Sequence, residues 1–349
     1  MKVLGIESSC DETAAAIVED GKQIISNVIA TQIPFHQIYN GVVPEIASRK
    51  HAEWILPVVT QALEQANMTL DDVDAIACTN RPGLIGSLLM GLTFGKTLAW
   101  TKNKPFIAVN HMLGHLYASN LILPGGDDLM AGVEYPYLGL LVSGGHSIIC
   151  KVNDFDSIEV LGTTIDDAVG EAFDKVAKFY NLGYPGGVII DRLAKNGDAR
   201  AANFPMPKLD KGESGEHRYD VSYSGLKTAV INQLDQFWCE GYEKTNENIC
   251  AAFQETAVRI LLSRLFRAVD DTGIKTVVAG GGVAANSRLR SMLAERTDIK
   301  CIFPPLKLCT DNGAMIAGVG YRFLARGDRS PWDTTAMARV TEFKRGLKK

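Results

Sequence analysis

The feature that most constrains the fold is a strand–turn–strand pattern that occurs twice. Near the start, apolar residues 3–6 and 14–18 flank a turn of small polar residues, and residues 137–142 and 147–150 flank a second such turn. Short apolar runs separated by turn residues are typical of β-hairpins. Two unrelated hairpins would give the same signal, but a pattern that recurs along a chain indicates related lobes. We therefore expect two lobes, each built on a mixed sheet.

Periodic apolar stretches between these hairpins predict helices. The longest, residues 249–271, carries apolar side chains at helical spacing. Further helices are expected at residues 46–66 (kinked at Pro57), 85–100, 167–180, 287–296 and 313–324, with a strand at 276–279. Alternating strands and helices indicate an α/β protein, and 349 residues are long for one core. Residues 203–219, rich in Pro, Gly and charge, are expected to form a mobile loop.

Two histidines, His111 and His115, follow the apolar run at residues 106–109. If Asn110 caps a helix, both imidazoles lie on one helical face, one turn apart. Two imidazoles at that spacing can hold one divalent transition metal; two incidental helix histidines are the alternative. A zinc peptidase of the HExxH type needs Glu directly after the first His, and Met112 stands there. A metal at this pair therefore does not fit peptide hydrolysis.

Asp311 stands at the expected start of the last helix. An acid there complements the helix dipole. It would equally complete a site of two histidines and one carboxylate, which leaves coordination positions open and suits iron or zinc. Both interpretations remain open from the residues alone.

Three turns of small residues follow expected strands, at residues 8–12, 143–145 and 280–282. Glycine lets a backbone approach an anion closely, and successive free N–H groups bind phosphate. Together the turns predict a nucleotide held between the lobes. Residues 280–285 match the dinucleotide pattern GxGxxA, but the next strand ends in Pro304 rather than in an acid. That weakens the dinucleotide interpretation, and the sequence contains no P-loop pattern.

Three acids are candidates for a role in binding or catalysis. Asp174 and Asp191 are either solvated helix acids or carboxylates that face a ribose hydroxyl or a cationic group, and periodicity does not decide between these. Glu12, in the first turn, is a candidate general base, with ordinary turn chemistry as the alternative.

Charge and cysteine content limit the class of protein. The net charge of −4 argues against a broad basic surface that would hold nucleic acid unaided. Seven cysteines without a CxxC pattern are typical of a reducing compartment. We find no signal-peptide pattern and no apolar stretch long enough to span a membrane, and we expect a cytoplasmic protein.

Nine ordered segments resemble the motifs of one family. They are residues 5–13, 43–51, 111–115, 141–146, 170–175, 184–187, 224–228, 281–286 and 309–317. The family is the tRNA N6-adenosine threonylcarbamoyltransferases (TsaD, formerly labelled glycoprotease or O-sialoglycoprotein endopeptidase), and the resemblance runs from residue 1 to about residue 325. It departs at Arg81, where Gly is usual, and at Tyr223, where Phe is usual.

The resemblance implies an actin-like, Hsp70-like (ASKHA) two-lobe α/β fold in which each lobe contains an RNase H-like mixed sheet. We expect residues 1–115 plus 320–349 to form the first lobe. Residues 116–319 form the second in this expectation, with the mobile insertion near 203–219.

The resemblance also implies the ligands and partners. His111, His115 and Asp311 would hold one divalent metal, Fe²⁺ or alternatively Zn²⁺. Threonylcarbamoyl-AMP would contact Leu141, Val142, Ser143, Gly144, Gly145, Asp174, Gly187, Asp191 and Asn286. The implied partners are tRNA, a paralogous ASKHA-fold subunit (TsaB) and a small ATPase (TsaE), with no membrane.

The implied activity is transfer of the threonylcarbamoyl group to N6 of the adenosine next to the anticodon (position 37) in tRNAs that read ANN codons, with release of AMP. Glu12 is the expected base. Three alternatives stand beside it: an ATP-dependent phosphotransferase of the same fold, a metallopeptidase, which Met112 disfavours, and a nucleotide-gated scaffold without enzymatic activity.

Overall fold

The computed structural model divides into two compact units. The first is made of Met1–Val133 and Pro304–Glu342, and the second of Glu134–Phe303 and Phe343–Lys349. Within these bounds the structure describes residues 1–209, 217–340 and 343. Part of the loop predicted at 203–219 therefore lies outside the described residues, and residues 203–209 form neither helix nor strand.

A five-stranded mixed sheet forms the centre of the first unit. Its strands are β1 (Lys2–Glu7), β2 (Glu12–Glu19), β3 (Gln23–Thr31), β4 (Ala75–Arg81) and β5 (Phe106–Asn110), in the order β3-β2-β1-β4-β5. β1 pairs antiparallel with β2 and parallel with β4, which in turn pairs parallel with β5. The carboxyl ends of β1, β4 and β5 therefore meet at one edge of the sheet.

The second unit repeats this topology. Its strands are β6 (Tyr137–Val142), β7 (Ser147–Asp154), β8 (Ser157–Thr163), β9 (Thr276–Gly280) and β10 (Lys300–Ile302), in the order β10-β9-β6-β7-β8. β6 pairs antiparallel with β7 and parallel with β9, as β1 does with β2 and β4. The two predicted hairpins are thus the corresponding first hairpins of two sheets with one strand order.

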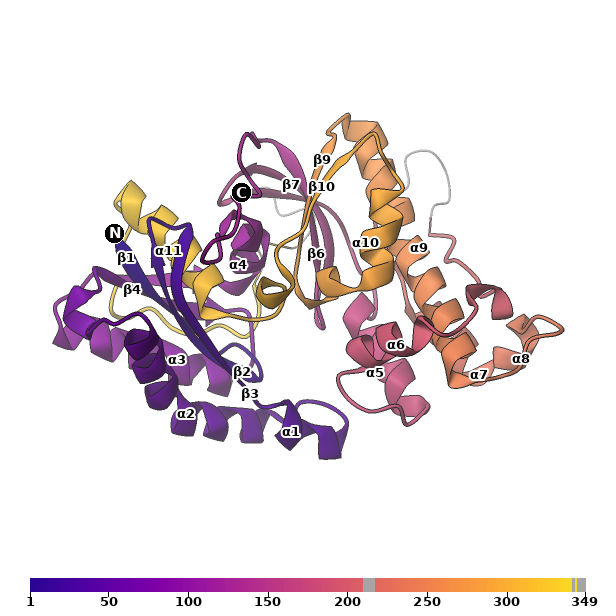
Figure 1. Ribbon diagram of the computed structural model, residues 1–349, viewed down its shortest axis with the longest axis horizontal. Coiled ribbons are helices and arrows are strands. Elements are labelled where there is room, and N and C mark those ends of the chain that lie inside the picture. Colours follow the sequence, from indigo (N-terminus) through magenta and orange to yellow (C-terminus); the bar gives the residue numbers. More distant parts are fainter. Residues whose placement is uncertain (210–216, 341–342, 344–349) are drawn as a thin grey trace. The chain divides into compact units, whose positions relative to one another are not determined.

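Helices cover both sheets (Figure 1). In the first unit they are α1 (Ile33–His36), α2 (Pro44–Gln65), α3 (Ile85–Thr101), α4 (His111–Tyr117) and α11 (Gly313–Arg326). In the second they are α5 (Val169–Phe179), α6 (Gly186–Ala194), α7 (Ser224–Asn232), α8 (Leu234–Phe237), α9 (Asn246–Thr272) and α10 (Ser287–Ala294). Short 3₁₀ turns lie at Gln37–Tyr39, Leu70–Asp72, Ala118–Asn120, Ala199–Ala201, Gly282–Ala285 and Leu306–Leu308.

The core of the first unit lies between its sheet and the pair α2 and α3. Leu4, Ile6 and Ile17 point from the strands toward Val58 and Leu92 on these helices, and all five are buried. α11 lies on the opposite face of the sheet (Figure 1). This arrangement follows from the alternation of side chains along a strand, which turns Gly5, between Leu4 and Ile6, toward α11.

The position of α11 changes the lobe boundaries that the sequence suggested. The prediction put residues 116–133 and 304–319 in the second lobe, whereas both segments pack within the first unit. α11 begins at Gly313 and lies against β1, β2 and β4, so its whole length belongs with the first sheet.

The predicted helices are present with small shifts at their ends, and α2 continues through Pro57. All seven cysteines are free. Among the described residues, no helix is both long and apolar enough to cross a membrane.

Candidate functional site

The two histidines lie on α4 as the sequence predicted. The helix starts directly after β5, and the Asn110 side chain accepts a hydrogen bond of 2.9 Å from the backbone N–H of Met112. This cap fixes the first turn. The rings of His111 and His115 lie 4.5 Å apart, centre to centre, and both are buried. Met112 is 1 % exposed in the core, so it takes no part in the site.

Asp311 reaches the histidines from the start of α11. Asn312 caps this helix by accepting a hydrogen bond of 3.0 Å from the Met315 N–H, and its amide donates to the Thr310 carbonyl at 2.8 Å. These bonds fix the chain on both sides of Asp311. Its Oδ1 lies 3.5 Å from Nε2 of His111 and 3.2 Å from Nε2 of His115.

Glycine contacts bring the two helix starts together. A Cβ on Gly5 would collide with the backbone of Gly313 and Ala317, so the start of α11 lies directly on β1. On α4, a Cβ at Gly114 would lie 3.0 Å from the Met315 side chain. Because α11 packs closely against both β1 and α4, Asp311 at its start lies next to the two histidines.

The three side chains fit a metal ion. Donors about 2.1 Å from a tetrahedral ion lie about 3.4 Å from one another, close to the two N–O distances given above. One donor atom from each of His111, His115 and Asp311 lies within 4.8 Å of the others. Two imidazoles and one carboxylate leave coordination positions open.

A buried carboxylate that the sequence analysis missed supports the first histidine. Glu7, fully buried at the end of β1, lies with Oε2 3.0 Å from Nδ1 of His111. Thr79 donates to the same oxygen, the Ser9 N–H donates to Oε1, and the Ser9 hydroxyl lies 3.2 Å from Nδ1. A metal-binding histidine usually donates its other N–H to such a group. The parallel pairing of β1 with β4 and of β4 with β5, which puts the ends of all three strands at one edge, is the signal that could have identified Glu7.

The electrostatics of the pair follow from its burial. Burial lowers the pKa of His111, but the charges of Asp311 and Glu7 outweigh it and raise that pKa to about 9. Burial raises the pKa of Glu7, but the charge and hydrogen bond of His111 leave it below its usual value. Nδ1 of His115, by contrast, has no hydrogen-bond partner among the described residues. At its Nδ1, His115 therefore has no counterpart of Glu7, and packing holds that side of the ring.

Glu12 lies in the same unit, at the start of β2, where its Oε1 accepts a hydrogen bond of 3.3 Å from the Thr31 hydroxyl. Burial, followed by the charges of Asp11 and Asp311, raises the pKa of Glu12 well above its usual value. A carboxylate with a raised pKa takes up a proton more readily than an ordinary one.

The other predicted site residues lie in the second unit, five of them at the end of β6 and in the turn that follows it. β6 ends with Leu141 and Val142, and the Ser143 N–H closes the following turn on the His146 carbonyl at 2.8 Å. A Cβ on Gly144 or Gly145 would meet no atom within 4 Å. The backbone of this turn is therefore open to a ligand.

The remaining four predicted site residues lie on helices α5 and α6 and at the start of α10. Asp174 accepts a hydrogen bond of 2.7 Å from the Gly186 N–H at the start of α6, next to Gly187. Asp191 accepts a bond of 2.7 Å from the Ser287 hydroxyl, and Asn286 caps α10 through the Leu289 N–H at 3.0 Å. The fold thus joins Asp174 to α6, and α6 to the start of α10.

The chain is closely similar to curated proteins along its whole length. Residues 23–318 match the family described as TsaD, tRNA N6-adenosine threonylcarbamoyltransferase. A protein of that name from Treponema denticola is 71% identical over 343 residues, 98% of each chain. The protein of that name from Treponema pallidum (strain Nichols) is 60% identical over 348 residues, 99% of this chain and 96% of the relative.

Solved structures show the fold. Component A of the (R)-2-hydroxyglutaryl-CoA dehydratase of Acidaminococcus fermentans is similar with a TM-score of 0.52 at 17% identity, over 93% of this chain and 99% of that one. Full-length HypF is similar with a TM-score of 0.57 at 14% identity, over 93% of this chain and 46% of its own. Together with the duplicated strand order, these similarities confirm the predicted actin-like (ASKHA) fold. By sequence, the chain belongs to the tRNA N6-adenosine threonylcarbamoyltransferase family and is a transferase that modifies tRNA.

Proposed function

We propose that the chain transfers the threonylcarbamoyl group of threonylcarbamoyl-AMP to N6 of adenosine 37 in tRNAs that read ANN codons, and releases AMP. The observation that carries the proposal is the set His111, His115 and Asp311, whose donor atoms converge in a member of this family. The proposed substrates follow from the family name and from the open turn at residues 143–145, whose backbone can approach a phosphate.

The proposed metal is Fe²⁺, with Zn²⁺ as the alternative, because the donor set suits both. When bound, such an ion supplies Lewis acidity toward a carbonyl oxygen. Glu7 would hold His111 in the tautomer whose Nε2 is free to coordinate. Metal analysis of protein purified without oxygen would distinguish the two ions.

The chain's own residues bind the donor and move the proton. We assign the adenylate to Leu141, Val142, Ser143, Gly144, Gly145, Asp174, Gly187, Asp191 and Asn286. The N6 amine attacks the carbamoyl carbon, the bond from that carbon to the phosphate oxygen breaks, and AMP leaves with the electron pair. Glu12 takes up the amine proton, a role that its raised pKa favours.

The proposed partners are a paralogous ASKHA-fold subunit (TsaB) and a small ATPase (TsaE), in the cytoplasm. A net charge of −4 supports this proposal, because tRNA binding then needs basic surface from elsewhere. The chain alone should bind tRNA weakly at physiological salt, which filter binding with and without partners would measure.

The test is mass spectrometry of tRNA nucleosides after incubation of tRNA with threonylcarbamoyl-AMP, ATP and the partner proteins. We expect threonylcarbamoyladenosine with the wild-type chain and none with His111→Ala. His217→Ala is the matched control, because His217 is a partly exposed histidine that pairs with Asp220 elsewhere in the chain. Full activity of metal-free His111→Ala would refute the role of the metal, and unmodified tRNA with the wild-type chain would refute the activity.

A further inference from the structure

The second unit contains a polar cavity of about 800 Å³ that the proposed reaction does not use. Its walls come from the end of α6, the segment at residues 197–206, and the helices α9 and α10. Its volume lies in the range of about 300–1,000 Å³ that is usual for ligand sites. None of Asp174, Gly187, Asp191 and Asn286, which we assign to the adenylate, lines it.

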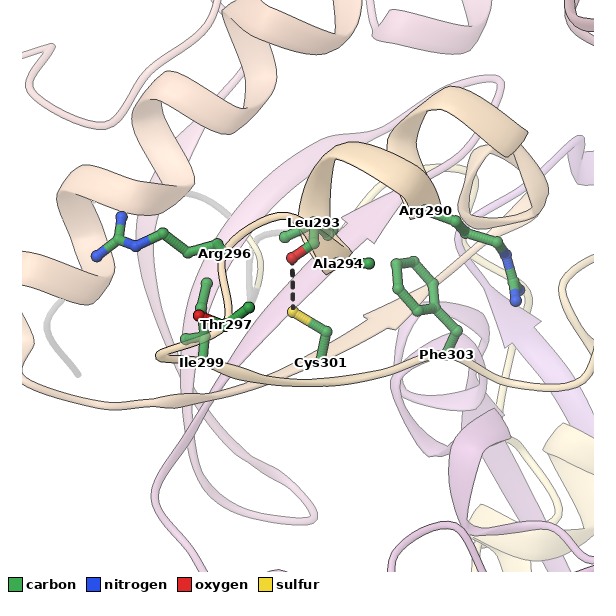
Figure 2. Close-up of a pocket in the computed structure, with 8 residues that line it drawn as sticks. All are labelled: Arg290, Leu293, Ala294, Arg296, Thr297, Ile299, Cys301 and Phe303. Atoms are coloured by element: carbon green, nitrogen blue, oxygen red, sulfur yellow. Dashed lines mark hydrogen bonds between the residues drawn. The ribbon is translucent and has the colours of Figure 1, made fainter.

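A second, smaller cavity of about 300 Å³ provides a contrast (Figure 2). Its two arginines point away from each other and away from the cavity. Arg290 donates to the Ala284 carbonyl and lies over the Phe303 ring, and Arg296 pairs with Asp270 and Asp298. Apart from Thr297 and Cys301, the other residues that line this cavity are apolar, and both of its arginines already have partners.

Among the described residues, the larger cavity has one positive charge with which no acid pairs. Arg200 pairs with Asp198, and Arg288 pairs with Glu255. Arg259, on α9, is exposed and makes no ion pair or hydrogen bond with any residue that the structure describes. Counted over the lining side chains, three arginines and two acids leave one net positive charge, in a chain whose net charge is −4. A guanidinium group that no acid neutralises can bind a phosphate through charged hydrogen bonds.

A buried amide supplies a second unused donor in the same wall. Gln254 is 5% exposed, and its Oε1 accepts a hydrogen bond of 2.8 Å from Nδ2 of Asn286. Within the described part of the chain, the bond from Asn286 to Oε1 is the one hydrogen bond of the Gln254 side chain, which leaves its Nε2 free to donate. Apolar atoms of Phe204 and Met206 complete the lining. A cationic group, an amide donor and apolar surface together match a nucleotide, which presents a phosphate, base acceptors and a flat ring.

We propose that this cavity binds one nucleotide of the tRNA substrate, with its phosphate on Arg259 and its base edge on Gln254. The proposal rests on the proposed function. RNA is favoured over the adenylate because the lining excludes the residues assigned to that ligand. RNA is favoured over a protein because the uncompensated charge and the amide face a concave polar site, whereas protein interfaces centre on apolar anchors.

The hydrogen bond from Asn286 to Gln254 links the cavity to the donor site. A nucleotide that accepts from Gln254 Nε2 would hold that side chain, and therefore Asn286, in place. The RNA would in this way steady a residue that we assign to the adenylate before transfer begins.

The test compares wild type, Arg259→Gln and the control Lys300→Gln, each assembled with the partner proteins. Lys300 is an exposed cation at the start of β10, outside the cavity. A fluorescent anticodon stem-loop is titrated at several salt concentrations, and KM is measured separately for tRNA and for threonylcarbamoyl-AMP.

We expect Arg259→Gln to weaken RNA binding about tenfold, since it removes one charged hydrogen-bonding group. The slope of log K against log salt should fall by about 0.7–0.9, the value for one phosphate. Lys300→Gln should change neither the affinity for RNA nor the salt slope. The KM for the donor, measured with tRNA at saturation so that the cavity is occupied, should stay constant in both variants.

Three outcomes would overturn the inference. They are an unchanged RNA affinity in Arg259→Gln, a rise in the donor KM instead, or a loss of affinity for a partner protein alone. Stem-loop binding is measured without catalysis. A wild-type complex that binds RNA through Arg259 but leaves it unmodified would therefore contradict the proposed function and not this site.

Discussion

Replacing Glu7 by Gln should weaken metal binding about 100-fold with little change in the fold. Loss of a group that orients a ligand histidine typically costs 10–100-fold in metal affinity, or about 1.4–2.7 kcal/mol. The structure argues for the upper end of that range. Ser9 donates its N–H to Oε1 of Glu7, so a Gln keeps its oxygen there and turns its NH₂ toward His111.

An NH₂ group beside Nδ1 of His111 requires Nδ1 to be the acceptor, which puts the ring proton on Nε2, the atom that must bind the metal. Glu7 is fully buried, so solvent does not replace the lost carboxylate. Glu7→Gln should therefore weaken metal binding in two ways: His111 loses the carboxylate that accepts from Nδ1, and its ring takes the tautomer with the proton on Nε2.

The assay is titration of metal-free protein with Co²⁺, followed by its visible absorption and by calorimetry, with thermal unfolding as the check on the fold. Glu45→Gln, an exposed acid in the first turn of α2, is the matched control. If Glu7→Gln bound Co²⁺ within threefold of wild type and with the same spectrum, the assigned role of Glu7 would be wrong.

Three further predictions follow from the same contacts. A chelator should lower the unfolding temperature of wild type but not of His111→Ala, because bound metal at 100 times its Kd adds about 2.7 kcal/mol to the folded state; calorimetry measures both. Gly5→Ala should destabilise the chain by about 3 kcal/mol or more in urea unfolding, because its Cβ meets backbone of Gly313 that has no room to move, whereas Gly225→Ala, whose Cβ meets nothing within 4 Å, should be neutral or stabilising. Burial lowers the pKa of His51 from its usual 6.5, so the unfolded state binds the proton more tightly and stability should fall as pH drops below about 6.5; urea unfolding at pH 7.5 and 5.5 should show a smaller loss in His51→Gln.

The parts of the fold that were predicted are those with a local signal. The strands around the two hairpins carry alternating or continuous apolar residues and end in small polar turns. α9 was evident from its length. α6 and α7 were missed because Gly186, Gly187 and Gly225 stand in their first turns, and glycine is a poor helix former. Tertiary packing, which no short window contains, stabilises these helices.

The site divides in the same way. The spacing of His111 and His115 is local, and Asn110 marked the start of their helix, so both were predicted and are brought together. Asp311 was a candidate because it stands at a helix start, but its approach depends on the contact of Gly313 with the first sheet. Glu7 carries no local signal, because an acid at the end of an apolar strand is common. Only the parallel pairing of β1, β4 and β5 makes it a neighbour of His111.

The candidate metal site and the open turn lie in different units of the duplicated topology. The first hairpin of each sheet has its turn at the corresponding place. In the first unit, Ser9 of this turn contacts His111 and donates a hydrogen bond to Glu7. In the second unit, Gly144 and Gly145 of this turn face open space. After β5 the chain enters α4 with the histidines, and after β10 it leaves the second unit at Pro304 and returns to form α11. That return carries Asp311 to the histidines. The candidate metal site is thus completed by Asp311, a residue that follows the second sheet in sequence.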